Sequence, residues 1–191
     1  MLLLTREVAS RLAPGAQLTE RRPEAGEPAP AVRVGERTLP GTPQRWQLEA
    51  ALLGALAPQH VLFMCVANSA RSQLAEALGR ALAPPGVVIS SAGSEPSAVR
   101  PEALEVLAEV GLDGSGQRSK GVDEVGGPTV EAVITLCAEE VCPVWLGGAL
   151  RLHWGLPDPA AAPAGPGRLE AFRSVRDELK KRLGLLFGTG G

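Results

Sequence analysis

From residue 60 onward, the apolar residues of the chain form short runs, separated by stretches whose apolar residues recur at helical spacing. The expected strands are 61–64, 87–90 and 132–136, and the expected helices are 72–82, 100–110 and 168–183. Because apolar strands that alternate with helices form buried parallel sheets, the pattern predicts an α/β fold, a parallel sheet with helices on both faces. A ligand site is then expected at the carboxyl ends of the strands.

The first 58 residues have a different composition. Residues 13–41 are rich in Pro, Gly, Arg and Glu, which is typical of loops and linkers. Within this stretch, the runs 31–34 and 37–39 flank a Gly-Glu pair and predict a small hairpin.

A helix is expected after the hairpin, with Thr42 as its N-cap and Pro43 as its first residue. Residues 2–12 are compatible with another short helix. We therefore divide the chain into an N-terminal extension, residues 1–58, and a main domain, residues 59–191. The extension either packs on the main domain or is a small partner-binding or dimerising module.

Charge and cysteine content narrow the possible functions. The formal net charge of −2 gives no reason to expect nucleic acid or an anionic membrane as a partner. No apolar run approaches the roughly 18 residues of a membrane span, and Met1–Leu4 is too short for the core of a signal peptide, so we expect a cytoplasmic protein. In that reducing compartment the three cysteines, Cys65, Cys137 and Cys142, favour redox chemistry over a structural disulfide. With two histidines and no zinc-type spacing, we expect no metal site.

The stretch 61–72 is the strongest candidate for a site, because a strand, a loop and a helix follow one another there. Backbone N–H groups of a loop that enters a helix N-terminus bind tetrahedral oxyanions, and Arg71 can hold two oxygens of such an anion. The positive electrostatic field of the helix N-terminus and of Arg71 also favours the thiolate form of Cys65. Ser72 can donate a hydrogen bond to the sulfur, and Asn68 can brace the loop. This combination predicts nucleophilic catalysis on a bound oxyanion. The alternative is a buried structural cysteine at a strand end.

The run Cys65-Val66-Ala67-Asn68-Ser69-Ala70-Arg71-Ser72 resembles the phosphate-binding loop of the low-molecular-weight protein tyrosine phosphatase fold. It is most similar to the loop of the thioredoxin-coupled arsenate reductases, which reads Cys-x-x-Asn-Ser-x-Arg-Ser. Family members often carry a second cysteine before the arginine, where this chain has alanine. The resemblance extends from residue 60 to about 184 and leaves the first 58 residues unassigned. The oxyanion-binding residues that it implies are Val66, Ala67, Asn68, Ser69, Ala70 and Arg71.

The resemblance also implies roles for the other two cysteines. Cys65 attacks arsenate, Cys137 attacks the Cys65–arsenic adduct and releases arsenite, and Cys142 then attacks Cys137. The resulting Cys137–Cys142 disulfide is reduced by thioredoxin. Family members commonly have a longer gap between these two cysteines than the four residues found in this chain.

A third motif, His153-Trp154-Gly155 followed by Asp158-Pro159, is similar to the family's His-Trp-Gly-x-x-Asp-Pro. The resemblance implies that Asp158 is the general acid for the leaving oxygen. We interpret His153 as a structural or interface residue rather than a base.

Some family members bind potassium through an Asn, a Glu, a Ser and an Asp. The first three match Asn68, Glu76 and Ser91, whereas the position of the Asp holds Lys120. An ammonium group there would substitute for the ion, so we expect no cofactor and no potassium requirement. The alternative is that Lys120 is a solvated loop lysine.

Three functions follow from these residues. Arsenate reduction for arsenic detoxification uses all three cysteines, with phosphate as a weak analogue of the substrate. Phosphotyrosine or phosphomonoester hydrolysis needs only Cys65, Arg71 and Asp158, and a weak activity of this kind is expected in either case. The chain has no Tyr, and Trp145 and Trp154 are the aromatic residues expected near the site, which disfavours the aromatic pocket of a tyrosine phosphatase. A non-enzymatic oxyanion or redox sensor is the third possibility, with the extension as its interaction module.

Overall fold

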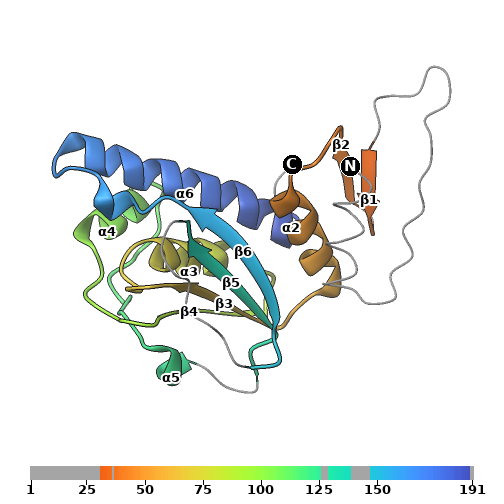
Figure 1. Cartoon of the computed structure of the whole chain (residues 1–191), viewed down its shortest axis with the longest axis horizontal. Coiled ribbons are helices and arrows are strands. Elements are labelled where there is room, and N and C mark those ends of the chain that lie inside the picture. The colour runs from red at the N-terminus through yellow and green to blue at the C-terminus, as the bar shows by residue number, and fades with distance from the viewer. Residues whose placement is uncertain (1–30, 36, 126–128, 139–146, 190–191) are drawn as a thin grey trace.

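The computed structural model of the chain describes residues 31–35, 37–125, 129–138 and 147–189. Within these residues a parallel four-stranded sheet has the strand order β4-β3-β5-β6 (Figure 1). Its strands are β3 (His60–Cys65), β4 (Val88–Gly93), β5 (Ala132–Cys137) and β6 (Leu150–Leu156). The predicted parallel α/β fold is confirmed. The possible helix over 2–12 and the proposed resolving residue Cys142 lie outside the described residues.

Helices cover the two faces of the sheet unequally (Figure 1). The helices on one face are α2 (Arg45–Leu56), α3 (Arg71–Leu82), α4 (Pro101–Ala108) and α6 (Pro166–Phe187). The single-turn helix α5 (Val122–Val125) lies against the other face, and a short 3-10 turn, η1 (Pro159–Ala161), precedes α6. None of the described helices combines the length and apolar character that a membrane crossing needs.

The central strands are apolar throughout because both of their faces are buried. Phe63 and Ile134 point into the larger core under α3 and α6, whereas Met64 and Val133 point into the smaller core under α5. Trp154 of the edge strand also lies in the larger core, where its ring centroid is 6.4 Å from that of Phe63.

Two expectations about single elements differ from the structure. No strand is expected from the sequence at 150–156, where β6 forms the edge of the sheet and its core side chains alternate with more exposed ones. Helix α2 begins at Arg45 and not at Pro43, because Gln44 and Gln47 form a capping box. In this box, the backbone N–H of Gln44 donates to Oε1 of Gln47 at 2.7 Å.

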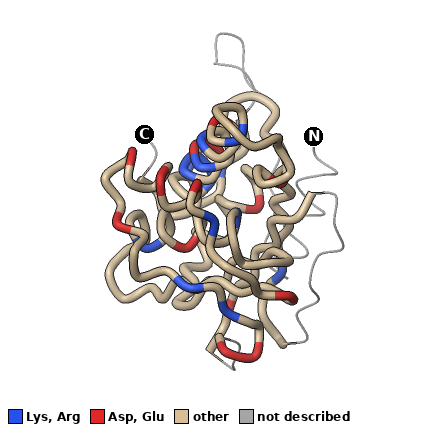
Figure 2. Tube along the Cα trace, turned by 90° about the vertical axis from the view of Figure 1, so that its left-hand side faces the viewer, with Lys and Arg blue, Asp and Glu red and all other residues tan. Residues whose placement is uncertain are grey.

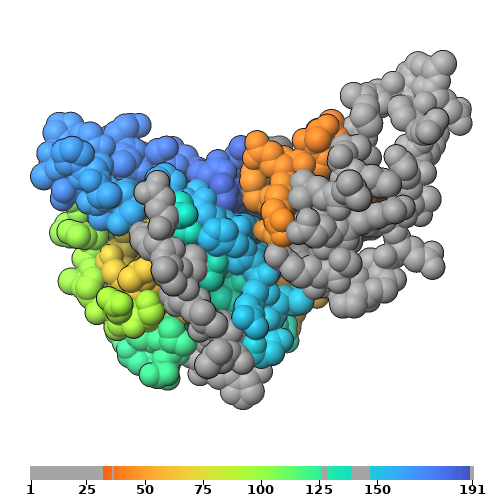
Figure 3. Space-filling model, in the orientation of Figure 1, coloured from red at the N-terminus to blue at the C-terminus, as the bar shows by residue number. Residues whose placement is uncertain are grey.

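The described part of the extension packs on the main domain. Strands β1 (Ala31–Val34) and β2 (Arg37–Pro40) pair as the predicted antiparallel hairpin. From β2, the Arg37 guanidinium donates to the carbonyl oxygens of Leu185 and Leu186 at the end of α6. Figure 3 shows the hairpin and α2 against the C-terminal end of α6. Along the described Cα trace, Lys and Arg residues are interspersed with Asp and Glu residues (Figure 2).

Candidate active site

Cys65 is the last residue of β3, and Arg71 is the first residue of α3. The five residues between them form the loop that is predicted to bind an oxyanion, residues 66–70, at the carboxyl edge of the sheet; we call it the oxyanion loop. The Cys65 side chain is buried, and its thiol is not part of a disulfide. The strand, loop and helix expected from the sequence are therefore present in the expected order.

A neighbouring segment holds the oxyanion loop in place by donating hydrogen bonds to the loop's carbonyl oxygens. Backbone N–H groups of the neighbouring segment 95–100 donate to the oxygens of Val66, Ala67 and Ser69 at 3.0, 3.0 and 2.9 Å. In a trans peptide the N–H points away from the C=O, so the N–H of each following residue is directed into the loop. Converging N–H groups at the start of a helix form a site for a tetrahedral anion.

Gly93, at the end of β4, allows this close contact between strand and loop. A Cβ atom there would lie 2.7 Å from the backbone nitrogen of Asn68 and would also collide with the carbonyl oxygen of Val66. The strand predicted nearby, residues 87–90, ends before this glycine. The sequence signal that could have identified it is a glycine at a strand end, which often marks a close backbone approach.

Arg71 is fixed at the open side of the loop by the last residues of β6. Its side chain is 5% exposed, and Nη1 donates to the carbonyl oxygen of Leu156 at 3.1 Å. Nη2 lies 3.9 Å from Oδ1 of Asp158, which also accepts a hydrogen bond from the backbone N–H of Ala160. The structure thus brings Asp158, 87 residues after Arg71 in the chain, to the same site.

Ser72 is oriented toward the sulfur of Cys65. The hydroxyl oxygen of Ser72 lies 2.9 Å from Sγ and accepts a hydrogen bond from Nδ2 of Asn68 at 2.8 Å. Because the oxygen already accepts this bond, the hydroxyl proton is available to the sulfur. A hydrogen bond donated to a sulfur stabilises its thiolate form.

Asn68 connects the loop to a buried ion pair. Its backbone has φ = 44°, a left-handed conformation that asparagine tolerates better than most residues. Its Nδ2 group also donates to Oγ of Ser91 at 2.8 Å, and the Ser91 hydroxyl donates to the Glu76 carboxylate. The four residues expected to support the loop, including Lys120, are all buried in this network.

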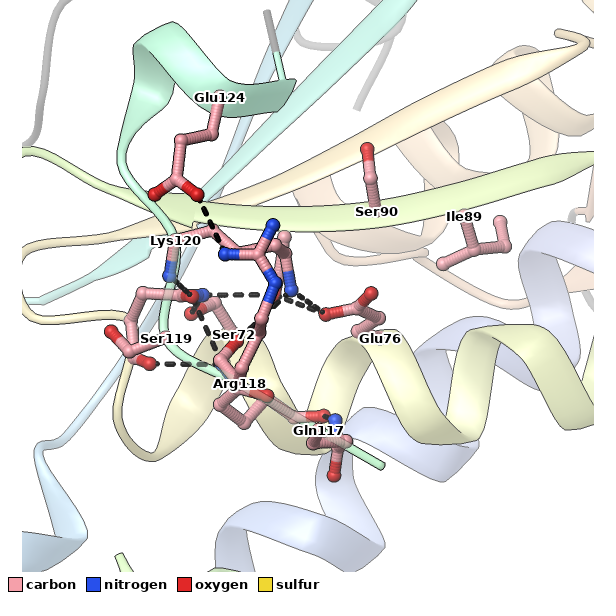
Figure 4. A network of polar contacts seen from close by, with 12 residues as sticks. Ser72, Glu76, Ile89, Ser90, Gln117, Arg118, Ser119, Lys120 and Glu124 are labelled. Carbon is pink, nitrogen blue, oxygen red and sulfur yellow. Dashed lines mark hydrogen bonds and ion pairs between the residues drawn. The ribbon is translucent and has the colours of Figure 1, made fainter. Parts of the chain in front are cut away.

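Lys120 supplies the cation of this network (Figure 4). Its Nζ atom lies 2.9 Å from Oε2 of Glu76 and 3.1 Å from the carbonyl oxygen of Arg118. Its backbone N–H donates to Oδ1 of Asn68 at 2.7 Å. The Lys120 residue is 8% exposed, so it is a buried partner of Glu76 and not a solvated loop lysine. Arg80 pairs with the other oxygen of Glu76.

Gln73, which was not among the residues expected at the site, also holds the loop. Its buried side-chain amide donates to the backbone oxygen of Asn68 at 3.0 Å, to Oδ1 of Asn68 at 2.9 Å and to the carbonyl oxygen of Arg118 at 2.9 Å. A polar residue in the first turn of a helix is ordinarily solvated, and nothing local in the sequence marks this one as buried.

Cys137 lies at the same edge of the sheet as Cys65. Strands β3 and β5 are neighbours, with Met64 opposite Thr135. Cys65 follows Met64 by one residue, and Cys137 follows Thr135 by two. Since neighbouring strands are about 4.8 Å apart, the two buried thiols belong to adjacent strand ends. Cys142, the third thiol of the predicted relay, is outside the described residues.

The aromatic residues do not form a pocket around the described part of the site. Trp154 is fully buried in the core, so the expectation that it lies near the mouth of the site is wrong. It is an inward-facing residue of β6, which the sequence analysis did not recognise as a strand. The segment 94–100 beside the oxyanion loop contains no aromatic residue, and Trp145 lies outside the described residues. Among the residues that the structure describes, no group of three or more His, Cys, Asp and Glu could hold a metal ion.

Comparisons with known proteins agree with this geometry. An arsenate reductase of Halalkalibacterium halodurans is 38% identical over 133 residues, which cover 68% of this chain and 96% of the relative. A solved structure described as an arsenate reductase in the phosphate binding state is 33% identical, with a TM-score of 0.58 over 70% of this chain and 99% of that one. A thioredoxin-dependent arsenate reductase of Corynebacterium glutamicum is 28% identical, with a TM-score of 0.52 over 75% of this chain and 69% of that one.

The family model for low molecular weight phosphotyrosine protein phosphatase matches residues 60–189, which include every described residue of the candidate site. The match begins at β3 and leaves out the hairpin and α2. The chain belongs to the low molecular weight phosphotyrosine protein phosphatase family.

Proposed function

We propose that this chain is an arsenate reductase that converts arsenate to arsenite with a relay of three cysteines. The observation that carries the proposal is that a second thiol outside any disulfide, Cys137, lies at the end of the strand adjacent to the one that leads into the loop at Cys65. Hydrolysis of a phosphate ester on the same loop requires no second thiol. The arsenate reductases among the relatives support the same substrate.

In the first step, the oxyanion loop and Arg71 hold arsenate, and the Cys65 thiolate attacks the arsenic atom. An As–O bond breaks as the S–As bond forms, and Asp158 protonates the leaving oxygen so that water departs. Ser72 stabilises the thiolate before the attack. The support for these roles is that Arg71, Ser72 and Asp158 surround one loop within hydrogen-bonding or ion-pair distance of their partners.

In the second step, the Cys137 thiolate attacks the sulfur of Cys65. A Cys65–Cys137 disulfide forms, the S–As bond breaks, and its electron pair reduces arsenic from the +5 to the +3 state, so that arsenite leaves. Cys142 then attacks Cys137, which frees Cys65 and leaves a Cys137–Cys142 disulfide. Thioredoxin is the proposed reductant of this disulfide, by analogy with the thioredoxin-dependent relative.

We further propose that the enzyme needs no potassium and no other cofactor. The Lys120 ammonium group already neutralises Glu76 beneath the oxyanion loop and is itself hydrogen-bonded to the Arg118 carbonyl. A monovalent cation in that place would have to displace a buried and paired side chain.

Phosphomonoester hydrolysis is the second candidate, because Cys65, Arg71 and Asp158 form a complete set for it. Phosphate and arsenate are close in shape and charge, so a weak hydrolytic activity on aryl phosphates is expected beside arsenate reduction. The segment 94–100 contains no aromatic residue that could stack on a phosphotyrosine ring.

The division into an extension, residues 1–58, and a catalytic domain, residues 59–191, is also a proposal. Its support is that the family match begins at residue 60. A cytoplasmic location fits a cycle that depends on free thiols and a disulfide reductant.

The proposed function is tested by following NADPH oxidation on addition of arsenate, with thioredoxin and thioredoxin reductase as the electron donors. We expect arsenate-dependent oxidation and formation of arsenite. A parallel assay with glutaredoxin and glutathione identifies the reductant. Hydrolysis of an aryl phosphate without any arsenate-dependent oxidation in either assay would favour the hydrolase instead.

A further inference from the structure

The side-chain amide of Gln73 has only one orientation that its neighbours allow. Gln73 is buried in the first turn of α3, and its Nε2 group faces the backbone oxygen of Asn68 at 3.0 Å, Oδ1 of Asn68 at 2.9 Å and the backbone oxygen of Arg118 at 2.9 Å. Backbone oxygens accept hydrogen bonds and never donate them. If the amide were turned over, its own oxygen would face these acceptors, so the amide must present Nε2 to Asn68.

The amide of Asn68 is oriented in turn. Its Oδ1 atom accepts from Nε2 of Gln73 at 2.9 Å and from the backbone N–H of Lys120 at 2.7 Å. Its Nδ2 group donates to the hydroxyl oxygens of Ser72 and Ser91, both at 2.8 Å. An asparagine amide has two N–H donors and one oxygen with two lone pairs, so these four bonds use its whole capacity. Gln73 supplies one of the two donors that keep the nitrogen end toward Ser72.

The hydroxyl group of Ser72 passes this orientation on to Cys65. Because its oxygen accepts from Asn68, its proton is directed at the sulfur, 2.9 Å away. With the Asn68 amide turned over, Oδ1 would face Ser72 and would compete with the sulfur for that proton. The hydrogen bonds therefore run in one direction, from Gln73 through Asn68 and Ser72 to the nucleophile.

We propose that Gln73 is a positioning residue for the nucleophile: it fixes the Asn68 amide, which leaves the Ser72 proton to the sulfur, and thereby raises the fraction of Cys65 that is present as thiolate. The inference deepens the proposed function and rests on the attack of Cys65 on arsenate. A hydrogen bond donated to a thiolate stabilises it relative to the thiol. The effect of Gln73 passes through the two residues that separate it from the sulfur.

Charged groups around the loop act on the same sulfur by another route. Among the described residues, they are Arg71 and Asp158 at the open side, the exposed Glu95 in the segment that holds the loop, the Cys137 thiol at the end of β5 and, beneath the loop, Glu76, Lys120 and Arg80. The side chain of Gln73 is neutral, so a neutral replacement changes none of these charges. Such a variant isolates the orientation of the Asn68 amide from the electrostatic field of the site.

The test measures how much of Cys65 is thiolate as a function of pH, in a protein that also carries Cys137→Ser and Cys142→Ser. Cys65 is then the only thiol, and its ionisation is followed by the ultraviolet absorbance of the thiolate. The chain has no Tyr, so no tyrosinate absorbs in the same range. Ser72→Ala removes the donor itself and should lower the ratio of thiolate to thiol about 10-fold at a given pH. Gln73→Met, which is similar in length but has no amide, should lower it about 3-fold.

A double variant separates this role from a general loosening of the loop. If Gln73 acts through the Ser72 hydroxyl, Gln73→Met should have no further effect on the ratio in the Ser72→Ala background. Gln117→Met is the matched control, because the Gln117 amide also belongs to this cluster but donates to the backbone oxygen of Gln73 at 2.8 Å. It should leave the ratio unchanged. An equal effect of Gln73→Met with and without Ser72, or an equal effect of Gln117→Met, would overturn the inference.

A measurement on a protein with an intact Gln73 covers the case in which Gln73→Met fails to fold. The side-chain amide proton signals of Asn68 and Gln73 should shift in NMR spectra with the same midpoint as the ionisation of Cys65, and this shift should be lost in Ser72→Ala. Signals that do not follow the ionisation, or that follow it equally without Ser72, would contradict the proposal. Neither measurement involves arsenate. Failure of the parent protein to reduce arsenate would therefore overturn the proposed function separately.

Discussion

The ammonium nitrogen of Lys120 lies 2.9 Å from Oε2 of Glu76, beneath the loop that is proposed to bind arsenate. The side chains of both residues are at least nine-tenths buried, so the pair is isolated from solvent. Through Ser91 and Asn68, the same carboxylate is connected to the hydroxyl group that faces the sulfur of Cys65. The ammonium group of Lys120 is thus part of the network that supports Cys65, the proposed nucleophile.

Replacing Lys120 by alanine should therefore weaken both the fold and the site. Removing one partner of a buried ion pair costs at most about 3–5 kcal/mol, and less here because Arg80 remains paired with Glu76. We expect a lower free energy of unfolding and a lower kcat for arsenate, measured by denaturant titration and steady-state kinetics. At fixed ionic strength, KCl should leave the parent enzyme unaffected and partly restore the variant. Activation of the parent enzyme by KCl would contradict the role given to Lys120.

The close contact between β4 and the oxyanion loop gives a second prediction. Gly93→Ala places a Cβ atom against the backbone of Val66 and Asn68, and overpacking of this kind costs about 1–3 kcal/mol. Because the displaced atoms belong to the anion site, hydrolysis of an aryl phosphate and arsenate turnover should fall together. Gly116→Ala is the matched control, since a Cβ atom there has no neighbour within 4 Å. Equal activity of the two variants would show that the loop tolerates the displacement.

The ion pairs of Glu109, at the end of α4, with Arg173 and Arg176 of α6 predict how the stability of the fold depends on pH. Hydrogen bonds from Arg173, together with the nearby Arg176, lower the pKa of Glu109 to about 2. A carboxyl group with a lowered pKa stabilises the fold above its unfolded pKa of about 4.3, and this contribution is lost as the pH falls through the folded value. Glu109→Gln should therefore lower Tm at pH 7, and the difference from the parent protein should diminish between pH 4 and pH 2. A Tm difference that is independent of pH would mean that packing, and not charge, is what the variant removes.

The sequence predicted the oxyanion loop well because its chemistry is local. Cys65, Arg71 and Ser72 are within eight residues of one another, and an apolar strand followed by a helical pattern fixes their arrangement. The parallel sheet also followed from the pattern, since the expected strands are apolar throughout, and the carboxyl ends of parallel strands meet at one edge. That β3 and β5 are neighbours, which places the ends carrying Cys65 and Cys137 side by side, is known only from the structure.

The rest of the site depends on contacts that no local pattern reveals. Gln73 is buried because it bonds a carbonyl group 45 residues away, and in the sequence it is an ordinary polar residue of a helix. Strand β6 was missed because it is an edge strand with an irregular register near Cys137, and Trp154 was misplaced as a consequence. Where strands and loops converge from distant parts of the chain, the fold must be known before the neighbours can be named.

The most direct test of the account is the effect of Cys137→Ser on two activities of the same protein. The serine retains the size of the side chain at the end of β5 and removes the second thiol of the relay. We expect catalytic arsenate turnover with thioredoxin to be abolished, while hydrolysis of para-nitrophenyl phosphate, which needs Cys65, Arg71 and Asp158, continues at its original rate. Continued turnover of arsenate by Cys137→Ser would show that electrons do not pass through Cys137, and the proposed mechanism would be wrong.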